Sequence, residues 1–303
     1  MVKVKKKILI VGGTGFIGYH LALYGLNNGY KVFSLSKNRP SKKRYLPNVN
    51  YIFTDILDKN KLLKIKDRFD YIINASGYGR HLNFNNNGYN LFKSHYFGIM
   101  NLVEFSKKKK IKKFIHLGSS FEYGQSKKKI KENYTTLPTS IYGVAKLACT
   151  NYLIKNKIFL KFPFTVFRLF QVYGPTQNEN RLIPYLINNC KKNKKIYVTH
   201  GSQMRNFCYV EDIAKAVFLS LSNKKTNGKI FNLASSENFK IFQIVKMIKN
   251  LIGKGKIFYG TKPMHLGETP VLKPDISRLK YHLKWRPTFK LSQGLDMLIN
   301  NRR

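Results

Sequence analysis

A tyrosine four residues before a lysine can act as an acid or a base, because this spacing brings both side chains onto one face of a helix. The ammonium favours the tyrosinate form and lowers a phenol pKa that is otherwise near ~10. The chain contains three such pairs: Tyr89 with Lys93, Tyr123 with Lys127, and Tyr142 with Lys146. With 19 tyrosines in a chain this rich in lysine, chance alone gives a similar number of pairs. The spacing therefore selects no catalytic pair, and the surrounding elements must decide.

The glycine-rich segment ILIVGGTGFIG gives a stronger signal, for binding a phosphate group. Gly12, Gly15 and Gly18 follow an apolar run directly and open a helical pattern. Glycine allows a tight turn and a close approach of the backbone to a pyrophosphate, which then lies at the positive N-terminus of the helix. This context predicts a dinucleotide site formed by the three glycines together with Phe16 and Ile17.

The end of the next predicted strand should distinguish NAD from NADP. A free ribose 2′-hydroxyl prefers an acidic residue there, whereas a 2′-phosphate prefers a basic one. The segment SLSKNRPSKKR has no acid but offers Ser36, Lys37 and Arg39, which favours NADP and leaves NAD as the alternative. An ordinary basic surface loop would have the same composition. Three residues after the third and fourth strands complete the predicted cofactor site: Asp55, for which an exposed turn is the alternative, Ile56 and Ala75.

The first half of the chain alternates short apolar runs with helical patterns, which predicts a parallel sheet covered on both faces. The expected strands are 7–11, 31–35, 50–53, 70–75, 113–118 and 164–170, and the expected helices are 16–28, 58–67, 86–107 and 141–156. Beyond residue 175 the spacing is irregular, with helices expected near 210–222 and 239–251. We therefore expect an α/β protein with a Rossmann-type doubly wound parallel sheet and a smaller C-terminal α/β lobe. The first domain is expected over 1–175 and the lobe over 176–303, with some later segments returning to the sheet.

The net charge of +42 comes from 56 basic and 14 acidic residues. Because the lysines occur in scattered runs, a solvated surface is the favoured interpretation, although a positive field also attracts nucleotides or nucleic acid. No apolar run approaches the roughly 20 residues needed to span a bilayer. Three widely spaced cysteines show no metal-type pairing, so we expect no metal site and a cytoplasmic location.

Several motifs together resemble the extended short-chain dehydrogenase/reductase family, also called the nucleotide-sugar epimerase/dehydratase family. They are GGTGFIG, TDI, GSSFEYG, YGVAK, RLFQVYGP, GSQMRNFCYVEDI and LKWRP, and they extend over nearly the whole chain. The resemblance implies a catalytic Ser119 at the end of the fifth strand, followed by a Tyr-x-x-x-Lys pair on the next long helix. That order selects Tyr142 and Lys146. Ser119 would hydrogen-bond the substrate oxygen, Tyr142 would exchange a proton, and Lys146 would also hold the nicotinamide ribose.

The segment GSSFEYG bears on which reaction the family member performs. Dehydratases of the family follow the catalytic Ser or Thr with an Asp-Glu pair, but this chain has Ser120 and Phe121 there, with Glu122 one place out of register. The resemblance therefore disfavours a dehydratase and leaves two activities. A 4-epimerase recycles a tightly bound NAD, whereas a ketoreductase consumes NADPH. The strand end without an acid favours the reductase.

A loop after the fourth strand, NASGYGRHLN, resembles that of CDP-paratose and CDP-abequose synthases, which reduce the C4 ketone of a CDP-linked 4-keto-6-deoxyhexose. This would place Tyr78, Arg80 and His81 over the substrate, the alternative being a structural surface loop. The family's diphosphate-binding arginine corresponds to Arg205, while Arg278 is as compatible with a helix surface. Two further positions depart from the common asparagine of the family: Gln171, which would contact the sugar, and His95.

The sequence thus favours NADPH-dependent reduction of a nucleotide-linked 4-keto-6-deoxyhexose for surface polysaccharide synthesis. The expected partners are a nucleotide-diphosphate sugar and, as is usual in the family, a second copy in a homodimer, without membrane contact. A nucleotide-sugar 4-epimerase is the main alternative. An RNA-binding member of the same fold is a remote one, because no basic stripe carries interleaved aromatic residues.

Overall fold

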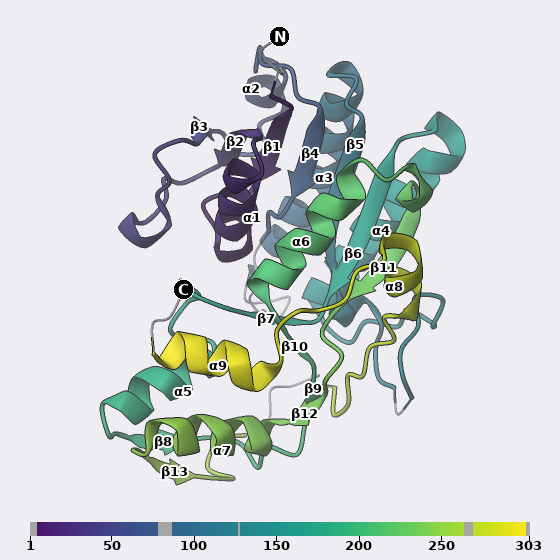
Figure 1. Cartoon of the computed structure of the whole chain (residues 1–303). Coiled ribbons are helices and arrows are strands. Elements are labelled where there is room, and N and C mark those ends of the chain that lie inside the picture. The colour runs from purple at the N-terminus through teal and green to yellow at the C-terminus, as the bar shows by residue number, and fades with distance from the viewer. Residues whose placement is uncertain (1–4, 78–86, 127, 264–268, 301–303) are drawn as a thin grey trace.

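The computed structural model describes residues 5–77, 87–126, 128–263 and 269–300. The apolar runs of the sequence form seven strands: β1 (Lys7–Val11), β2 (Lys31–Ser36), β3 (Asn50–Phe53), β4 (Tyr71–Asn74), β5 (Lys113–Ser119), β6 (Phe164–Leu169) and β11 (Lys229–Leu233). They pair in parallel in the order β11-β6-β5-β4-β1-β2-β3 (Figure 1). Every residue of β5 and β6 is buried, as expected for strands covered on both faces.

Helices cover both faces of this sheet (Figure 1). On one face lie α1 (Phe16–Asn27), α6 (Val210–Leu221) and α8 (Ser277–Leu283), and on the other lie α2 (Lys59–Leu63), α3 (Tyr89–Lys108) and α4 (Ile141–Leu160). Leu21, Val217 and Leu279 belong to one apolar core, whereas Ile99 and Leu153 belong to a second core across the sheet. The two separate cores confirm the predicted doubly wound α/β class.

A smaller lobe lies below the carboxyl edge of the sheet in the view of Figure 1. Its helices α5 (Leu182–Lys191), α7 (Ile241–Ile252) and α9 (Leu291–Ile299) share a third apolar core that contains Leu186, Ile244 and Leu295. Strands β8 (Lys195–Tyr197) and β13 (Lys256–Phe258) form a parallel pair beside it. Two further pairs join the lobe to the sheet: β7 (Gln171–Tyr173) with β10 (Phe207–Tyr209), and β9 (Met204–Arg205) with β12 (Phe239–Lys240).

Segments from the second half of the chain belong to the sheet as well as to the lobe. Strand β11 forms its edge next to β6, and α6 and α8 pack on its face. Three 3-10 turns complete the described elements: η1 (Lys42–Arg44), η3 (Ser120–Glu122) and η4 (Lys224–Thr226). The division at residue 175 stays a prediction, because the chain crosses between the two parts more than once.

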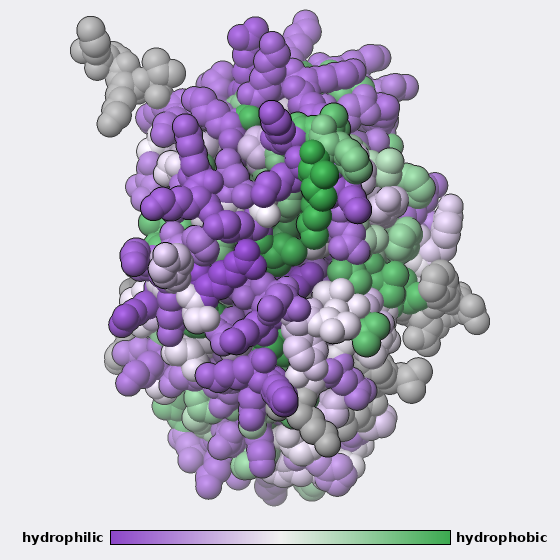
Figure 2. All heavy atoms as spheres, turned by 90° about the vertical axis from the view of Figure 1, so that its right-hand side faces the viewer, coloured by the Kyte–Doolittle hydropathy of each residue, from purple (hydrophilic) through white to green (hydrophobic). Residues whose placement is uncertain are grey.

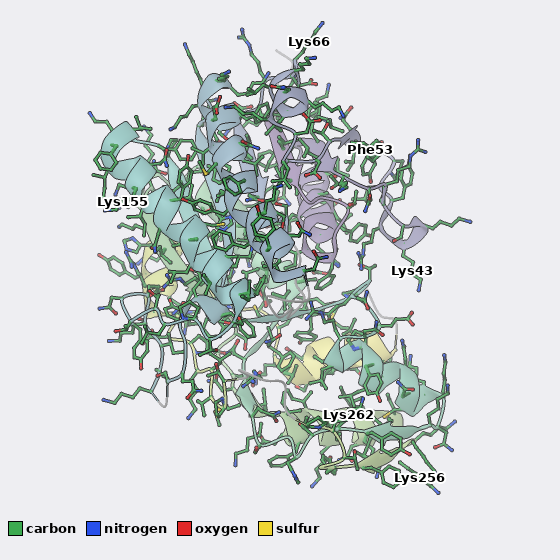
Figure 3. All side chains as sticks on the ribbon, turned by 180° about the vertical axis from the view of Figure 1, so that it is seen from behind. Lys43, Phe53, Lys66, Lys155, Lys256 and Lys262 are labelled. Carbon is green, nitrogen blue, oxygen red and sulfur yellow. The ribbon has the colours of Figure 1, made fainter. Side chains whose placement is uncertain are left out.

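The excess positive charge is spread over the surface. Hydrophilic side chains cover most of the face seen in Figure 2. The labelled Lys43, Lys66, Lys155 and Lys256 point outward from four separate parts of the molecule (Figure 3), and all are exposed. Among the described residues, no helix is both long and apolar enough to cross a membrane.

One buried side chain, Asn206, fixes the strand region that carries Arg205. The Asn206 amide donates to the carbonyl oxygens of Ser235, at 2.9 Å, and Glu237, at 2.7 Å, and its oxygen accepts the Ser235 N–H at 2.8 Å. Asn206 is 1% exposed. The Asn206 side chain therefore makes hydrogen bonds to the backbone that join the β9–β10 junction to the segment after β11.

We expect Asn206→Ala to lower the free energy of unfolding by about 3 kcal/mol, because it leaves buried backbone groups without partners. Urea denaturation followed by circular dichroism measures this loss. Asn189→Ala is the control, since half-buried Asn189 donates to a single carbonyl within its own helix. Equal losses for the two variants would contradict the prediction.

Candidate active site

Two adjoining cavities lie at the carboxyl ends of the parallel strands, where open α/β sheets bind ligands. The first, of about 600 Å³, is lined by the glycine loop and by the ends of β2 and β3. The second, of about 590 Å³, extends from the glycine loop past the end of β5 to the lobe. They share four residues, Gly15, Ala75, Ser76 and Gly77. The first cavity therefore has room for an extended ligand, and the second cavity has room for another ligand next to it.

The glycine loop is folded so tightly that side chains are excluded from it. A Cβ on Gly18 would lie 2.1 Å from the carbonyl oxygen of Gly12, and a Cβ on Gly12 would lie 2.8 Å from the Cα of Ser76. Gly12 also has a φ of +80°, a conformation that favours glycine. Helix α1 begins after Gly15 without a side-chain cap and without an acid in its first turn. Its first residues, Phe16, Ile17 and Gly18, line the second cavity, and the N–H groups of such a helix start suit a pyrophosphate.

The end of β2 offers a cation to the first cavity. Lys37 lines it together with Ser36, and the Lys37 ammonium lies 3.2 Å from a carboxylate oxygen of Asp55. The side chains of Lys37 and Asp55 are 66% and 34% exposed, so the pair is open to solvent. Gly12, Asp55 and Ile56, which the sequence assigns to the cofactor site, also line this cavity. Arg39 lines neither cavity and lies over the ring of Phe53, with its Cζ 5.7 Å from the ring centroid.

Ser119, Tyr142 and Lys146 line the second cavity together, and Phe16, Ile17 and Gly18 line it as well. Ser119 ends β5, and the other two lie in the first two turns of α4, whose start Ser140 caps by accepting the Gly143 N–H. The Lys146 ammonium donates to the carbonyl oxygen of Leu117 at 2.9 Å and lies 5.9 Å from the centroid of the Tyr142 ring. Two elements, β5 and α4, thus bring a hydroxyl, a phenol and an ammonium to the lining of one cavity.

The two other Tyr-x-x-x-Lys pairs are not placed for this chemistry. Tyr123 is completely buried and donates to Asn232 Oδ1 at 2.7 Å, and burial raises its pKa far above the usual range. Its spacing partner, Lys127, lies outside the described residues. Tyr89 is 62% exposed on α3. Only the element order, and not the spacing, could have separated these pairs in the sequence.

No carboxylate of the described residues after Ser119 faces the cavity. Ser120 and Phe121 line it, and Phe121 packs edge-on against Tyr142 with 5.9 Å between ring centroids. Glu122 is completely buried on the opposite side of the turn. Its carboxylate accepts from the Ser119 N–H, the Thr150 hydroxyl and the Arg168 Nε, each at 2.8 Å. Glu122 is therefore held away from any ligand in the cavity.

Two buried histidines lie near Tyr142 and Lys146. The rings of His95 and Tyr142 meet edge-on, with 5.7 Å between their centroids. His116 lies beside Asn74, with 3.2 Å between His116 Nδ1 and the Asn74 amide nitrogen. Burial, and then the nearby charges of Lys146 and His95, hold the pKa of His116 well below its usual range. His116 is therefore neutral at physiological pH and adds no positive charge behind Lys146.

The far end of the second cavity carries several arginines. Arg205 lines it and is 4% exposed, and its Nη1 donates to the carbonyl oxygens of Met204, at 2.9 Å, and Pro270, at 3.4 Å. Gln171 lines the same cavity. Arg278 does not, and its Cζ lies 5.6 Å from the ring centroid of Phe231. Its predicted contact with substrate thus has no support from the cavity lining. The predicted contacts of Tyr78, Arg80 and His81 fall outside the described residues.

Sequence reasoning missed several polar residues of this lining. They are Arg44, Gln177, Asn178, Asn180 and Arg181. Arg44 reaches the cavity from η1 because its Nη2 donates to the carbonyl oxygen of Thr176 at 2.6 Å. The one signal in the sequence for Arg44 and Arg181 was that each is an arginine in a chain with many lysines, since a planar guanidinium is the better phosphate ligand.

Comparisons with known proteins agree with this geometry. The model of the NAD dependent epimerase/dehydratase family matches residues 8–234. A UDP-N-acetyl-alpha-D-glucosaminuronate decarboxylase of Bacillus cytotoxicus is 27% identical, and a putative UDP-glucose 4-epimerase of Methanocaldococcus jannaschii is 28% identical; each alignment covers 97% of both chains. The crystal structure of a UDP-glucuronic acid 4-epimerase from Bacillus cereus, in complex with UDP-glucuronic acid and NAD, superposes with a TM-score of 0.87 at 27% identity. That superposition covers 97% of this chain and 98% of the epimerase.

The names of these relatives describe different reactions on nucleotide sugars. They do not single out the CDP-sugar ketoreductases that the YGRH loop resembles, so that narrower resemblance is not supported. The broader one is confirmed by the family model, which matches residues 8–234 and so includes the glycine loop, Ser119, Tyr142 and Lys146 in one alignment. The chain belongs to the NAD dependent epimerase/dehydratase family, whose members named here act on nucleotide sugars.

Proposed function

We propose that the protein reduces the C4 ketone of a nucleotide-linked 4-keto-6-deoxyhexose with NADPH, in the synthesis of a surface polysaccharide sugar. The observation that carries the proposal is the second cavity, where Ser119, Tyr142 and Lys146 line one wall. Ser120 and Phe121 occupy the positions at which dehydratases carry their acid and base. A site with a proton donor but without that carboxylate pair suits addition of hydrogen better than removal of water.

The residues divide the work of such a reduction. The bound nicotinamide would supply the hydride to the carbonyl carbon. Tyr142 gives its phenolic proton to the carbonyl oxygen, and Lys146 stabilises the tyrosinate that remains. The Ser119 Oγ accepts the Phe121 N–H at 3.2 Å, which leaves its own hydrogen to be donated to the same oxygen. Phe121 covers the reacting groups with an apolar ring and helps to exclude water.

The preference for NADPH rests on the end of β2. Among the described residues, Ser36, Lys37 and Asn38 line the first cavity where an NAD-binding protein would place an acid. Lys37 neutralises Asp55, the one carboxylate of that lining, across 3.2 Å. A ribose 2′-phosphate would therefore meet an ammonium rather than an uncompensated carboxylate.

A nucleotide-sugar 4-epimerase with tightly bound NAD is the second candidate. It is favoured by the relatives, since one is named as a putative UDP-glucose 4-epimerase and another neighbour was solved with NAD. The same serine, tyrosine and lysine serve both reactions, so turnover must decide between them. Arg205 and the arginines near it suit the diphosphate of either substrate.

Binding of nucleic acid and assembly with a second copy concern other surfaces. The lysines labelled in Figure 3 lie on separate parts of the molecule, which favours a dispersed charge over the single basic stripe that RNA binding would use. A homodimer stays a prediction, for which exposed Phe97 on α3 and Val144 on α4 offer apolar contact area. A cytoplasmic location also stays a prediction.

We expect the purified protein to oxidise NADPH stoichiometrically with one member of a panel of CDP-, dTDP-, UDP- and GDP-linked 4-keto-6-deoxyhexoses. Tyr142→Phe should lower kcat at least about 100-fold, because it removes the proton donor. Absorbance of the reduced nicotinamide measures both. Tyr89→Phe is the matched control, since Tyr89 begins another Tyr-x-x-x-Lys pair on the surface and should keep full activity. An absence of net oxidation, with NAD released only on denaturation, would establish the epimerase instead.

We expect Lys37→Ala to raise the Kd for NADPH about tenfold and to leave the Kd for NADH unchanged, because a charged hydrogen bond to the 2′-phosphate is lost. The substitution also exposes Asp55 to that phosphate. Titration of cofactor fluorescence measures both constants. Lys43→Ala provides the control, since Lys43 is exposed in the following turn and pairs with Glu179. Equal effects on NADPH and NADH would contradict the assigned preference.

A further inference from the structure

Glu122 occupies a position for which the proposed chemistry has no direct use, yet it is the most completely bonded carboxylate near the site. It is 0% exposed, and both of its oxygens accept hydrogen bonds from groups on different elements. A carboxylate is costly to bury and needs compensating donors. We therefore asked what these donors have in common.

The first donor is the backbone of the catalytic serine. Glu122 Oε1 accepts the Ser119 N–H at 2.8 Å, while Ser119 Oγ accepts the Phe121 N–H at 3.2 Å. These reciprocal bonds form a capping box across η3. They fix the last residue of β5 and use the Ser119 oxygen only as an acceptor, so that its hydroxyl hydrogen is left for another partner. A Cβ on Gly118 would lie 2.4 Å from Glu122 Oε1, so the strand has little room to shift.

The second donor lies on the helix that carries the catalytic tyrosine and lysine. Glu122 Oε2 accepts the hydroxyl of Thr150 at 2.8 Å, and Thr150 is completely buried. Thr150 follows Lys146 by four residues, so both side chains lie on the same face of α4. The Lys146 ammonium contacts β5 itself, through the Leu117 carbonyl at 2.9 Å. The hydrogen bonds of Thr150 and Lys146 therefore fix the position of α4 along β5 and the rotation of the helix about its own axis.

The third donor balances the charge. Arg168 on β6 is 3% exposed, and its Nε donates to Glu122 Oε2 at 2.8 Å. Its guanidinium also lies over the ring of Tyr123, with the Cζ 4.4 Å from the centroid. Burial alone would lower the pKa of Arg168, but the nearby Glu122 carboxylate raises it, so Arg168 keeps its positive charge. The carboxylate is thereby held in one orientation.

From these contacts we infer that Glu122 is a positioning residue, which ties the Ser119 end of β5 to the Tyr142–Lys146 face of α4. Its function is to fix the distance between the serine hydroxyl and the tyrosine phenol across the substrate oxygen. The inference rests on the proposed function only in assuming that the three residues act on one oxygen, which both reduction and epimerisation require.

Thr150 offers a sharper test than Glu122, because Glu122→Gln leaves Arg168 buried without its counter-charge and risks misfolding. Thr150→Val keeps the shape and removes only the bond to α4, while Glu122 keeps its bonds to Ser119 and Arg168. We expect kcat to fall about tenfold with an unchanged KM for the nucleotide sugar, because the reacting groups lose alignment rather than substrate contacts. Thr150→Ser retains the hydroxyl, and its kcat should be within about twofold of the wild-type value.

Thr165→Val is the matched control. Thr165 is also completely buried, and its hydroxyl donates to the Thr226 carbonyl at 2.8 Å, but it lies at the opposite, amino end of β6. It should lower thermal stability comparably and leave kcat unchanged. Hydrogen–deuterium exchange gives a readout that needs no turnover: Thr150→Val, and not Thr165→Val, should speed exchange in peptides covering 117–124.

The outcomes separate this inference from the proposed function. If the wild-type protein epimerises instead of reducing, the reductase proposal fails, and the same kcat comparison is made on epimerisation. If it turns over no substrate, the exchange comparison decides. A wild-type kcat in Thr150→Val, an equal loss in Thr165→Val, no rescue by Thr150→Ser, or unchanged exchange at 117–124 would each overturn the positioning role.

Discussion

The parallel pairing of the central strands is the constraint on which the site depends. Since β1, β4 and β5 all run in one direction, their carboxyl ends meet at one edge, and the chain must turn there after each strand. The glycine loop follows β1, Ala75 follows β4, and Ser119 is the last residue of β5 before the next turn. The same topology sends each following helix back over a face of the sheet, so that α1 and α4 both begin at this edge. The first turn of α1 and the side chains of Ser119, Tyr142 and Lys146 are thereby gathered at one edge of the sheet.

The scarcity of acids gives the few carboxylates special importance. With 14 acidic residues against 56 basic ones, most cations are left to the solvent. Several of the carboxylates instead bind backbone N–H groups at junctions between elements. Asp212 accepts from Thr288 and Phe289, and Glu237 accepts from Leu291. Burial raises the pKa of Asp212, yet the two N–H groups favour its charged form. Stability near neutral pH therefore depends on a handful of anions, while the surface carries the excess positive charge.

Phe121 and Glu122 are adjacent in the sequence, yet the first lines the cavity and the second is buried in the protein interior. Phe121 faces the cavity and Glu122 faces the interior, because one step along a 3-10 turn rotates a side chain by about 120°. A carboxylate at residue 121 would reach a ligand, whereas at residue 122 it reaches Thr150 and Arg168. The absence of an acid from this part of the cavity and the rigidity of its wall thus come from the same register.

The sequence alone was enough to predict the doubly wound sheet and the glycine loop, because both depend on local order along the chain: apolar runs of strand length and glycines at fixed spacing. The choice of Tyr142 over the other two tyrosines needed the family resemblance as well, and its catalytic role stays a prediction. The contacts of the folded chain were needed to show that Arg44 and Arg181 join Arg205 at one cavity, that Arg278 lies elsewhere, and that Glu122 faces Thr150 and Arg168. These contacts join residues far apart in the chain, and in a sequence with so many cations no local pattern distinguishes the few that face the ligand.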